Sequence, residues 1–489
     1  MPGRERLHSY SGDVVEAQVH HPRSIDELRE ILRMASQRRT RLTFRGGGCA
    51  LDTQSLNTEV VSLAALDRIE VDPERGTVTV GPGATWGAIL TRTVRHGLVP
   101  YVTVTTRHTT AAGTVSSDSI SRFSPSCGKE GRHVLSVRLL TISGEELYCS
   151  RAHHRDVFFG MVGGLGYLGV IVAIEIRLLP LGRDPAVESR VTPCASFAEL
   201  IQALAPGTPT SPGSDAGPPT SPDAAVACYA VCFQRRALIF RGRYLNTSAR
   251  RPLRVLHEPE KLRRRLTDLL LRLPFVNRLV WWLIFTVMFR RERTYIDGLA
   301  DYTFFMDGNV HAKQLGQRLG LAMRVLQQTF VIPAAGRDAA GASANGASTV
   351  AGFLEEMSAA LEQRRLVPTM FDILFVPADE GFLLSSSNRL DGYAVSFAFD
   401  TSNHATRARA YDFLIWATKR CRVVGGRVSL VKNVCADASD IAAMYGEAMD
   451  EFLALKRRLD PHGLLHNEFF DRVFSARMSI ASAAEQLAG

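Results

Sequence analysis

Residues 41–50 read RLTFRGGGCA, and the first prediction of the fold rests on this stretch. Residues 41–44 are expected to form a short strand, and three consecutive glycines follow after one arginine. A strand that runs into Gly46, Gly47 and Gly48 carries no side-chain bulk there, so a phosphate or a planar ring can approach the backbone amides. A tight turn explains such a run equally well when it stands alone. The order of the surrounding elements must therefore decide between the two interpretations.

The elements around the glycine run are mostly short strands. Ser24 and Glu27 have the spacing of a capping box, so a helix is expected over residues 25–36. A second helix is expected over residues 84–96, directly before Gly97. The expected strands are residues 60–62, 69–71 and 77–80, interpreted as an antiparallel meander, and residues 134–142, 147–149 and 170–179. This mixture differs from the regular alternation of strands and helices in a dinucleotide-binding fold.

Length and composition indicate an ordinary folded protein of more than one domain. The 489 residues are enough for two or three domains, and the content is 46% hydrophobic and 22% charged. The eight cysteines show no paired or metal-type spacing, so reduced thiols and no metal site are expected. The sequence begins without the apolar run of a secretory signal and contains no clear membrane span, so we expect a cytoplasmic location.

The charge and one apolar segment bear on partners. Lys and Arg outnumber Asp and Glu by 58 to 49, a formal net charge of +9, which suits an anionic lipid or a phosphorylated substrate; we expect no nucleic-acid partner. Residues 279–289 form a short apolar run with paired tryptophans between arginines. Such a run suits the bilayer interface, so peripheral contact with an anionic membrane, on its inner face, is expected. A buried core helix is an alternative of equal weight.

The order of these elements resembles the FAD-binding domain of the vanillyl-alcohol-oxidase (PCMH-type) superfamily, over about residues 14–180. The resemblance implies an α+β fold. It places a PCMH-type FAD-binding domain of two α/β subdomains at residues 1–185. A substrate-binding domain, built on an antiparallel sheet with flanking helices, follows at 186–425, and residues 426–489 return to the FAD domain. Composition adds two disordered loops near residues 205–222 and 334–348.

The same resemblance implies FAD as the cofactor and a set of residues that contact it. These residues are Arg45, Gly46, Gly47, Gly48, Cys49, Ala50, Thr105, Thr110, Ala111, Ala112, Gly113, Ser117, Asp118, Ser119, Ile171 and Ser429. Many members of the superfamily attach the flavin to a histidine directly after the triple glycine, where this chain has Cys49. Noncovalent FAD is therefore expected, and a cysteinyl adduct is the lesser alternative.

A narrower resemblance is to the decaprenylphosphoryl-β-D-ribose oxidases, carried by residues 106–113, 330–333, 425–427 and 457–461. It implies that Lys432 is a catalytic cation at the flavin and the substrate, because a fixed positive charge stabilises charge that develops on the ring. It also implies that Arg122, Gln327 and Ser396 bind substrate. This chain departs from that family where Ile120 and Arg122 replace a histidine and a lysine, and where Ser396 replaces a cysteine.

These resemblances favour one reaction and leave two alternatives open. The favoured reaction is the oxidation of a secondary alcohol by hydride transfer to flavin N5, on a sugar-like small molecule that is phosphorylated or lipid-linked. The first alternative is a flavin-dependent reductase of a carbon–carbon double bond, of the Δ24-sterol reductase type, which the missing histidine favours. The second is a scaffold without flavin, against which the intact glycines argue.

The mode of flavin attachment can be tested by denaturation. Because Cys49 stands where the linking histidine would be, precipitation with acid is expected to release FAD into the supernatant and leave a colourless pellet. The measurement is the flavin absorbance of both fractions. Flavin that stays with the washed polypeptide would show that a covalent link exists.

Overall fold

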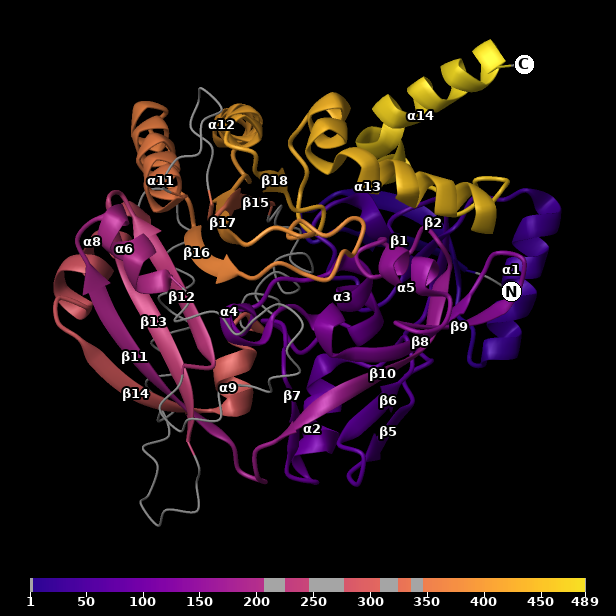
Figure 1. Ribbon diagram of the computed structural model, residues 1–489, viewed down its shortest axis with the longest axis horizontal. Helices are drawn as coiled ribbons and strands as arrows, with labels where there is room; N and C mark the ends of the chain where they lie inside the picture. The colour runs from indigo at the N-terminus through magenta and orange to yellow at the C-terminus, as the bar shows by residue number, and fades with distance from the viewer. Residues whose placement is uncertain (1–2, 206–224, 246–276, 308–323, 336–345, 489) are drawn as a thin grey trace.

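The computed structural model describes residues 3–205, 225–245, 277–307, 324–335 and 346–488, and these ranges form three β-sheets with helices packed on them (Figure 1). Most of the first expected loop, residues 206–222, lies outside the described residues. The second expected loop needs a correction, because residues 346–348 already belong to helix α11 (Gly346–Gln363).

The first sheet contains the strand that directly precedes the triple glycine. Its order is β1-β2-β4-β3, with β1 antiparallel to β2 and the other pairs parallel. The strands are β1 (Gly3–His8), β2 (Val14–His20), β3 (Thr43–Arg45) and β4 (Glu59–Ser62). The expected meander is wrong for residues 60–62: β4 lies between two parallel partners, with Val60 and Val61 both fully buried, and does not pair with β5. Helix α1 (Ile25–Arg38) begins after Ser24, whose side chain accepts from Glu27 N, as the capping box predicts.

The second sheet is antiparallel, in the order β5-β6-β10-β8-β9, and β7 pairs with the end of β10. Its strands are β5 (Ile69–Asp72), β6 (Thr77–Val80), β7 (Leu98–Pro100), β8 (Val134–Leu140), β9 (Glu146–Ser150) and β10 (Val170–Pro180). The helices are α2 (Trp86–Val94), α3 (Ala111–Ser117), α4 (Ser124–Cys127) and α5 (Arg155–Met161), with short 3₁₀ turns η1 (Thr53–Ser55) and η2 (Glu130–His133). We call residues 3–180, which hold both sheets, the N-terminal domain.

The described residues between positions 186 and 428 build the third sheet and its helices, which we call the sheet domain. Eight strands run in the order β14-β11-β13-β12-β16-β17-β15-β18, and every pair is antiparallel. They are β11 (Ala186–Cys194), β12 (Ala227–Phe233), β13 (Arg236–Leu245), β14 (Arg293–Gly298), β15 (Val325–Pro333), β16 (Met370–Val376), β17 (Gly392–Asp400) and β18 (Arg427–Val428). Helices α6 (Phe197–Leu204), α11 and α12 (His404–Val423) pack against one face of this sheet (Figure 1). Shorter helical segments are α8 (Asn277–Leu283), the π-helical turn η3 (Ile284–Met288) and α9 (Leu299–Thr303).

The last part of the chain returns to the N-terminal domain. Helix α13 (Ala438–Leu459) contacts α5, and α14 (Glu468–Ala488) contacts η1, so both lie over the N-terminal domain in Figure 1. Leu42 N donates to Leu464 O over 2.9 Å, and Tyr167 Oη donates to Asn467 Oδ1 over 2.7 Å. Residues 429–488 are therefore a clamp across the two domains.

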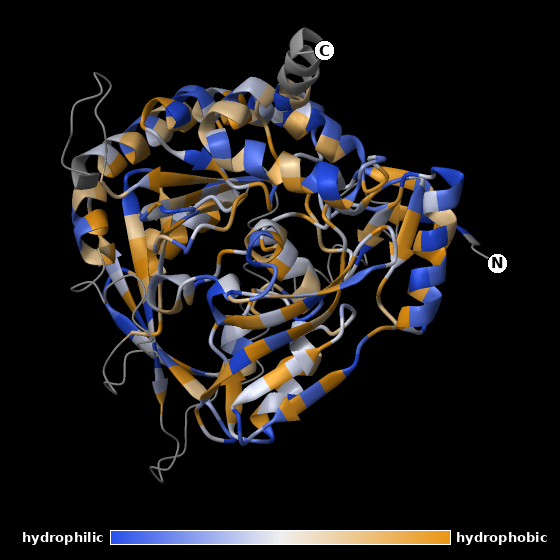
Figure 2. Cartoon of the chain, turned by 45° about the vertical axis from the view of Figure 1, so that its right-hand side comes forward, coloured by the Kyte–Doolittle hydropathy of each residue, from blue (hydrophilic) through white to orange (hydrophobic). Residues whose placement is uncertain are grey.

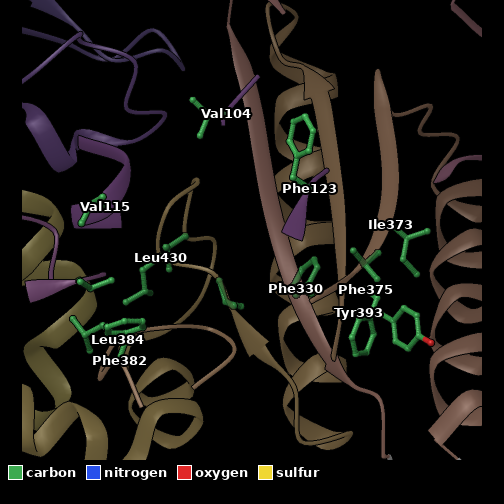
Figure 3. Close-up of a cluster of buried hydrophobic side chains, with 14 of the residues drawn as sticks. Val104, Val115, Phe123, Phe330, Ile373, Phe375, Phe382, Leu384, Tyr393 and Leu430 are labelled. Atoms are coloured by element: carbon green, nitrogen blue, oxygen red, sulfur yellow. The ribbon is translucent and has the colours of Figure 1, made fainter. Parts of the chain in front are cut away.

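One apolar core runs through both domains. Figure 3 shows part of it, with Val104 and Val115 from the N-terminal domain and Phe330 and Ile373 from the sheet domain. The helices on the outside carry hydrophilic and hydrophobic residues together (Figure 2), as expected for elements with one face on a core. Because this apolar core is continuous, it fixes the orientation of the two domains relative to each other.

A buried ion cluster adds a polar link between the domains. Lys129 donates to Asp118, which follows α3, and to Ser385, and its Nζ lies 3.2 Å from Asp379 Oδ2. Lys129 and both carboxylates are almost wholly buried, so each charge depends on its partners. The cluster fixes the end of α3 against the loop between β16 and β17.

Candidate functional site

A cavity of about 340 Å³ lies where the N-terminal domain, the sheet domain and the clamp meet. Three groups of residues line it: the glycine run and the hydroxyl-rich segment before and within α3, the inner face of β15, β16 and β17, and residues 429, 431 and 432 of the clamp. Glycines 166 and 169, which precede β10, complete the wall. The cavity thus combines a wall of bare backbone with a wall of side chains.

The bare wall depends on close backbone contact. A Cβ at Gly47 would overlap the carbonyl oxygen of His108, and a Cβ at Gly46 would overlap the hydroxyl of Thr110. Gly48 has a φ of +69°, which residues with a Cβ rarely adopt. The close contacts in this wall therefore require all three glycines.

A row of hydroxyl groups lies beside the glycines. The lining includes Thr105, Thr106, Thr109 and Thr110, followed by Ser116, Ser117 and Ser119. Thr110 is the N-cap of α3, and its side chain accepts from Gly113 N over 3.2 Å. Hydroxyls and backbone amides next to bare glycines are the groups that bind a pyrophosphate without a metal. The residues present fit the phosphate part of FAD.

The sheet domain supplies the second wall through strand alternation. On β16, Met370, Asp372 and Leu374 line the cavity, whereas the alternate residues belong to the core. Figure 3 shows two of those alternate residues, Ile373 and Phe375, within the buried cluster. This alternation places one carboxylate in the cavity.

Three polar residues form a row across the sheet. Thr329, Ser396 and Asp372 occupy paired positions on β15, β17 and β16. The hydroxyls of Thr329 and Ser396 are 2.7 Å apart, and the Ser396 hydroxyl also interacts with Asp372. We call these residues the polar row.

The clamp positions Lys432 at the end of this row. Gln54 Nε2 donates to the carbonyl oxygens of Leu430 and Lys432, over 3.2 Å and 3.1 Å. Asn433 Oδ1 accepts from Gln327 N over 2.9 Å and from the Ser11 hydroxyl over 3.0 Å. The backbone on both sides of Lys432 is therefore held by the N-terminal domain and by β15.

Asp372 and Lys432 influence each other's ionisation. Burial raises the pKa of Asp372 to about 6, and Lys432 and the Ser396 hydroxyl act in the opposite direction. Burial lowers the pKa of Lys432 from its usual value, and Asp372 opposes that change. Both groups therefore titrate closer to neutral pH than an exposed aspartate or lysine does.

The structure brings most of the sequence-predicted site residues together. Those that line the cavity are Gly46, Gly47, Gly48, Cys49, Ala50, Thr105, Thr110, Ala112, Gly113, Ser117, Ser119, Ile171, Gln327, Ser396, Ser429 and Lys432. Three residues predicted to contact FAD do not line it. The Arg45 side chain donates instead to His8 O (2.9 Å) and Ser55 Oγ (3.1 Å), Ala111 is buried beneath the start of α3, and Asp118 accepts from Lys129.

Arg122, predicted to bind substrate, also needs a correction. Its guanidinium lies 3.8 Å from the ring centroid of Phe305, 4.6 Å from that of Tyr229 and 4.8 Å from that of Tyr302. It donates to Tyr302 O over 3.1 Å and does not line the cavity. The aromatic rings hold this guanidinium behind the cavity wall. From there its positive charge acts to lower the pKa of Asp372.

Sequence reasoning missed Asp372 and Gln54. Asp372 is the one charged residue in the otherwise apolar strand Met370–Val376, and that break in the pattern was an available signal. Gln54 carried no such signal, because its partners Leu430 and Lys432 lie more than 370 residues away in the sequence.

Comparisons with known proteins support the cofactor assignment. Residues 17–150 match a family model described as an FAD binding domain. Cytokinin dehydrogenase 1 of Arabidopsis thaliana is 30% identical over 171 residues, which are 33% of this chain and 30% of that protein. Cytokinin dehydrogenase 7 of Oryza sativa subsp. japonica is 31% identical over 174 residues, 33% of each chain. An uncharacterized oxidoreductase, ORF5 in the fasciation locus of Rhodococcoides fascians, is 29% identical over 159 residues, 32% of this chain and 36% of that protein.

The glycine wall, the hydroxyl row and the family match together define an FAD-binding protein. Residues 17–150 therefore carry an FAD-binding domain of the vanillyl-alcohol-oxidase (PCMH-type) superfamily, which confirms the prediction of that superfamily and of an α+β fold. The matched regions span about a third of the length of the curated relatives. The narrower resemblance to the ribose oxidases stays a prediction.

The close contact at Gly47 predicts a specific loss of cofactor. Gly47→Ala is expected to weaken FAD binding by on the order of 10- to 100-fold, because relieving an overlap with backbone costs ~1–3 kcal/mol. The measurement is titration of the apoprotein with FAD by fluorescence quenching. The control is Gly352→Ala on α11, where an added Cβ meets nothing within 4 Å. Unchanged affinity in Gly47→Ala would contradict the role of the glycine wall.

Proposed function

We propose that this chain is an FAD-dependent oxidoreductase that oxidises a secondary alcohol of a sugar-like substrate. The observation that carries the proposal is that Lys432 and the polar row face the same cavity as the glycine wall and the hydroxyl row. Cofactor-binding groups lie on one side of this cavity, and groups that can bind and polarise a hydroxyl lie on the other. Bound FAD supplies the acceptor for a hydride at N5.

The chain's own residues divide the remaining work. Thr329 and Ser396 offer hydroxyls that orient a substrate hydroxyl by hydrogen bonds, and Gln327 adds an amide beside them. Lys432 holds a positive charge at the cavity, which stabilises negative charge as it develops during reduction. Apolar neighbours such as Leu374 and Val431 limit water in the cavity.

The substrate class follows from the polar row and from the ribose-oxidase resemblance. Hydroxyl groups in a row match the repeated hydroxyls of a sugar or cyclitol. We also propose that this substrate is phosphorylated or lipid-linked. The resemblance and the net charge of +9 support this part of the proposal. Arg122 does not serve as its phosphate ligand, because that guanidinium is held among aromatic rings.

A second candidate is reduction of a carbon–carbon double bond with NADPH as electron source. Ile120 lines the cavity where the ribose-oxidase resemblance would place a histidine, and this apolar contact favours the alternative. Cytokinins also belong in any substrate panel, since relatives of this chain are named cytokinin dehydrogenases.

We propose that FAD is bound without a covalent link. Cys49 lines the cavity directly after the triple glycine, and its thiol contacts Gly47 O at 3.5 Å. The chain offers no histidine at this position. The acid-release experiment described above tests this part of the proposal.

The test of function is anaerobic reduction of the bound flavin by a defined panel: ribose 5-phosphate, a prenylphosphoryl ribose, myo-inositol, a cytokinin and NADPH. We expect a sugar-type alcohol to bleach the flavin. Lys432→Ala is expected to keep FAD and to slow this reduction by on the order of 100-fold or more, because a positioned cation acts where charge appears in the transition state. Stopped-flow absorbance at saturating substrate measures the rate.

Two variants serve as controls for this prediction. Lys432→Arg is expected to restore only part of the rate, because a planar guanidinium does not occupy the place of a compact ammonium. Lys419→Ala, at an exposed position on α12, is expected to leave the rate unchanged. Bleaching by NADPH alone would support the reductase instead, and a parental rate in Lys432→Ala would remove Lys432 from the mechanism.

We further propose peripheral contact with an anionic membrane through α8 and η3. Their apolar residues divide between two faces: Val280, Trp281, Ile284 and Phe285 pack into a core cluster, whereas Leu279, Trp282, Leu283 and Val287 are exposed. Exposed arginines at positions 278, 290, 291 and 293 flank the exposed face. No helix in the described ranges is both long and apolar enough to span a bilayer. A surface contact is the mode that fits the exposed face.

Liposome flotation tests the membrane proposal. The protein is expected to bind vesicles with phosphatidylserine at least tenfold more strongly than neutral vesicles, because each basic residue near an anionic surface contributes about 1 kcal/mol. Trp282→Ser is expected to weaken this binding, and Tyr411→Ser, which removes another exposed ring on α12, is the control. Equal binding to both vesicles, or no effect of Trp282→Ser, would contradict the proposal.

A further inference from the structure

The reaction proposed above needs a group that accepts the hydroxyl proton, and the ionisable residues of the cavity limit the choice. Among the described residues that line it, Asp372 is the only carboxylate, Lys432 is the only cation, and histidine is absent. Tyr10 and Cys49 also line the cavity. Both belong to the cofactor side: Tyr10 N donates to Ala50 O over 2.7 Å, beside the glycine run.

The carboxylate of Asp372 is only partly engaged. Its Oδ1 atom is buried and has no hydrogen-bond partner among the described residues, whereas the neighbouring Ser396 hydroxyl acts to lower the pKa of the carboxyl group. A buried acceptor without a donor is costly unless a ligand supplies one. Asp372 lines the cavity within the polar row, so its carboxyl group can accept a hydrogen bond from a hydroxyl bound there.

We propose that Asp372 is the general base that removes the proton from the substrate hydroxyl; this inference rests on the proposed function. In the step, the O–H bond breaks and its proton moves to Asp372. The electron pair of that bond forms the second bond of the carbonyl, while the C–H bond breaks and its pair leaves as the hydride that the flavin accepts. The substrate loses two electrons and two hydrogens, and each has a named acceptor.

The charges around Asp372 favour its ionised form, which a general base requires. Lys432 faces it from the clamp, and Arg122 reaches it from behind the wall, so two cations favour the ionised carboxylate. Cys232 on β12 also senses the charge of Asp372, and burial raises the pKa of that thiol well above its usual value, which keeps it neutral. The aromatic rings around Arg122 fix one cation, and Gln54 fixes the backbone of the other.

The division of labour between Asp372 and Lys432 predicts a bell-shaped pH profile. A base must be ionised, so the rate of flavin reduction is expected to rise with pH through about 6, the pKa to which burial raises Asp372. The cation must stay protonated, so the rate is expected to fall at alkaline pH, earlier than an ordinary lysine would require, because burial lowers the pKa of Lys432. The acidic limb belongs to Asp372 and the alkaline limb to Lys432.

The kinetic test uses the FAD-loaded full chain and the panel alcohol that bleaches it. Asp372→Asn is expected to keep FAD, to slow flavin reduction by on the order of 100-fold or more at neutral pH, and to lose the acidic limb. Asp26→Asn, at a carboxylate that is 91% exposed on α1, is the matched control and is expected to keep both rate and limb. A parental rate with an intact acidic limb in Asp372→Asn would overturn the inference and leave the proposed function standing.

A second measurement does not depend on turnover. Infrared difference spectra of the protein between pH 5 and pH 7 are expected to show the carbonyl band of a protonated carboxyl that disappears as pH rises. Asp372→Asn is expected to remove the component of this band that titrates near pH 6, and Asp26→Asn to keep it. If no panel compound bleaches the flavin, the proposed function fails on that result alone. Spectra in which Asp372→Asn leaves the band unchanged overturn the inference whatever the substrate.

Discussion

The site depends on one steric constraint, the contact between the backbone at Gly46 and Gly47 and the segment at His108 and Thr110. Side chains at either glycine would separate β3 from the start of α3. The loop that follows β3 in the first sheet meets the segment before α3 at this contact, so it fixes both the relation of the two halves of the N-terminal domain and the shape of the cofactor wall. The same atoms therefore serve the fold and the binding of FAD.

The opposite wall is held by polar contacts that residues distant in sequence supply. Gln54 bonds two carbonyls of the clamp, Asn433 joins the clamp to β15, and Arg472 donates to Asp52 Oδ2 over 2.6 Å. The buried Lys129 adds a bond from the end of α3 to the loop after β16. Removing one member of such a buried ion cluster leaves an uncompensated charge, so these contacts fix the geometry more firmly than exposed ion pairs do. Within this frame, the charges of Lys432 and Asp372 influence each other's pKa.

Local patterns in the sequence predicted the glycine run and the elements around it, whereas the residues of the substrate side came only from the resemblance to the ribose oxidases. The glycine run, the Ser24 cap and the strands of the second sheet follow from local patterns, and the structure confirms them. The pairing of residues 60–62 did not follow, because a β-branched run has the same pattern in a parallel strand as in a meander. The side chain of Arg122 was misplaced for a related reason: Tyr229, Tyr302 and Phe305 lie far along the chain, and only the folded sheet domain brings them around it.

The clamp also determines when the protein can acquire its cofactor during synthesis. Gln54 and Lys432 are 378 residues apart, and Asp52 and Arg472 are 420 apart. At about 5–20 residues per second, a ribosome needs on the order of half a minute to add that length after the glycine run has emerged. The nascent N-terminal domain can form its sheets in that interval. The cavity, however, lacks the lining residues of the clamp until the clamp leaves the ribosome. The complete cavity is therefore available to FAD only after residues 429–432 have been synthesised.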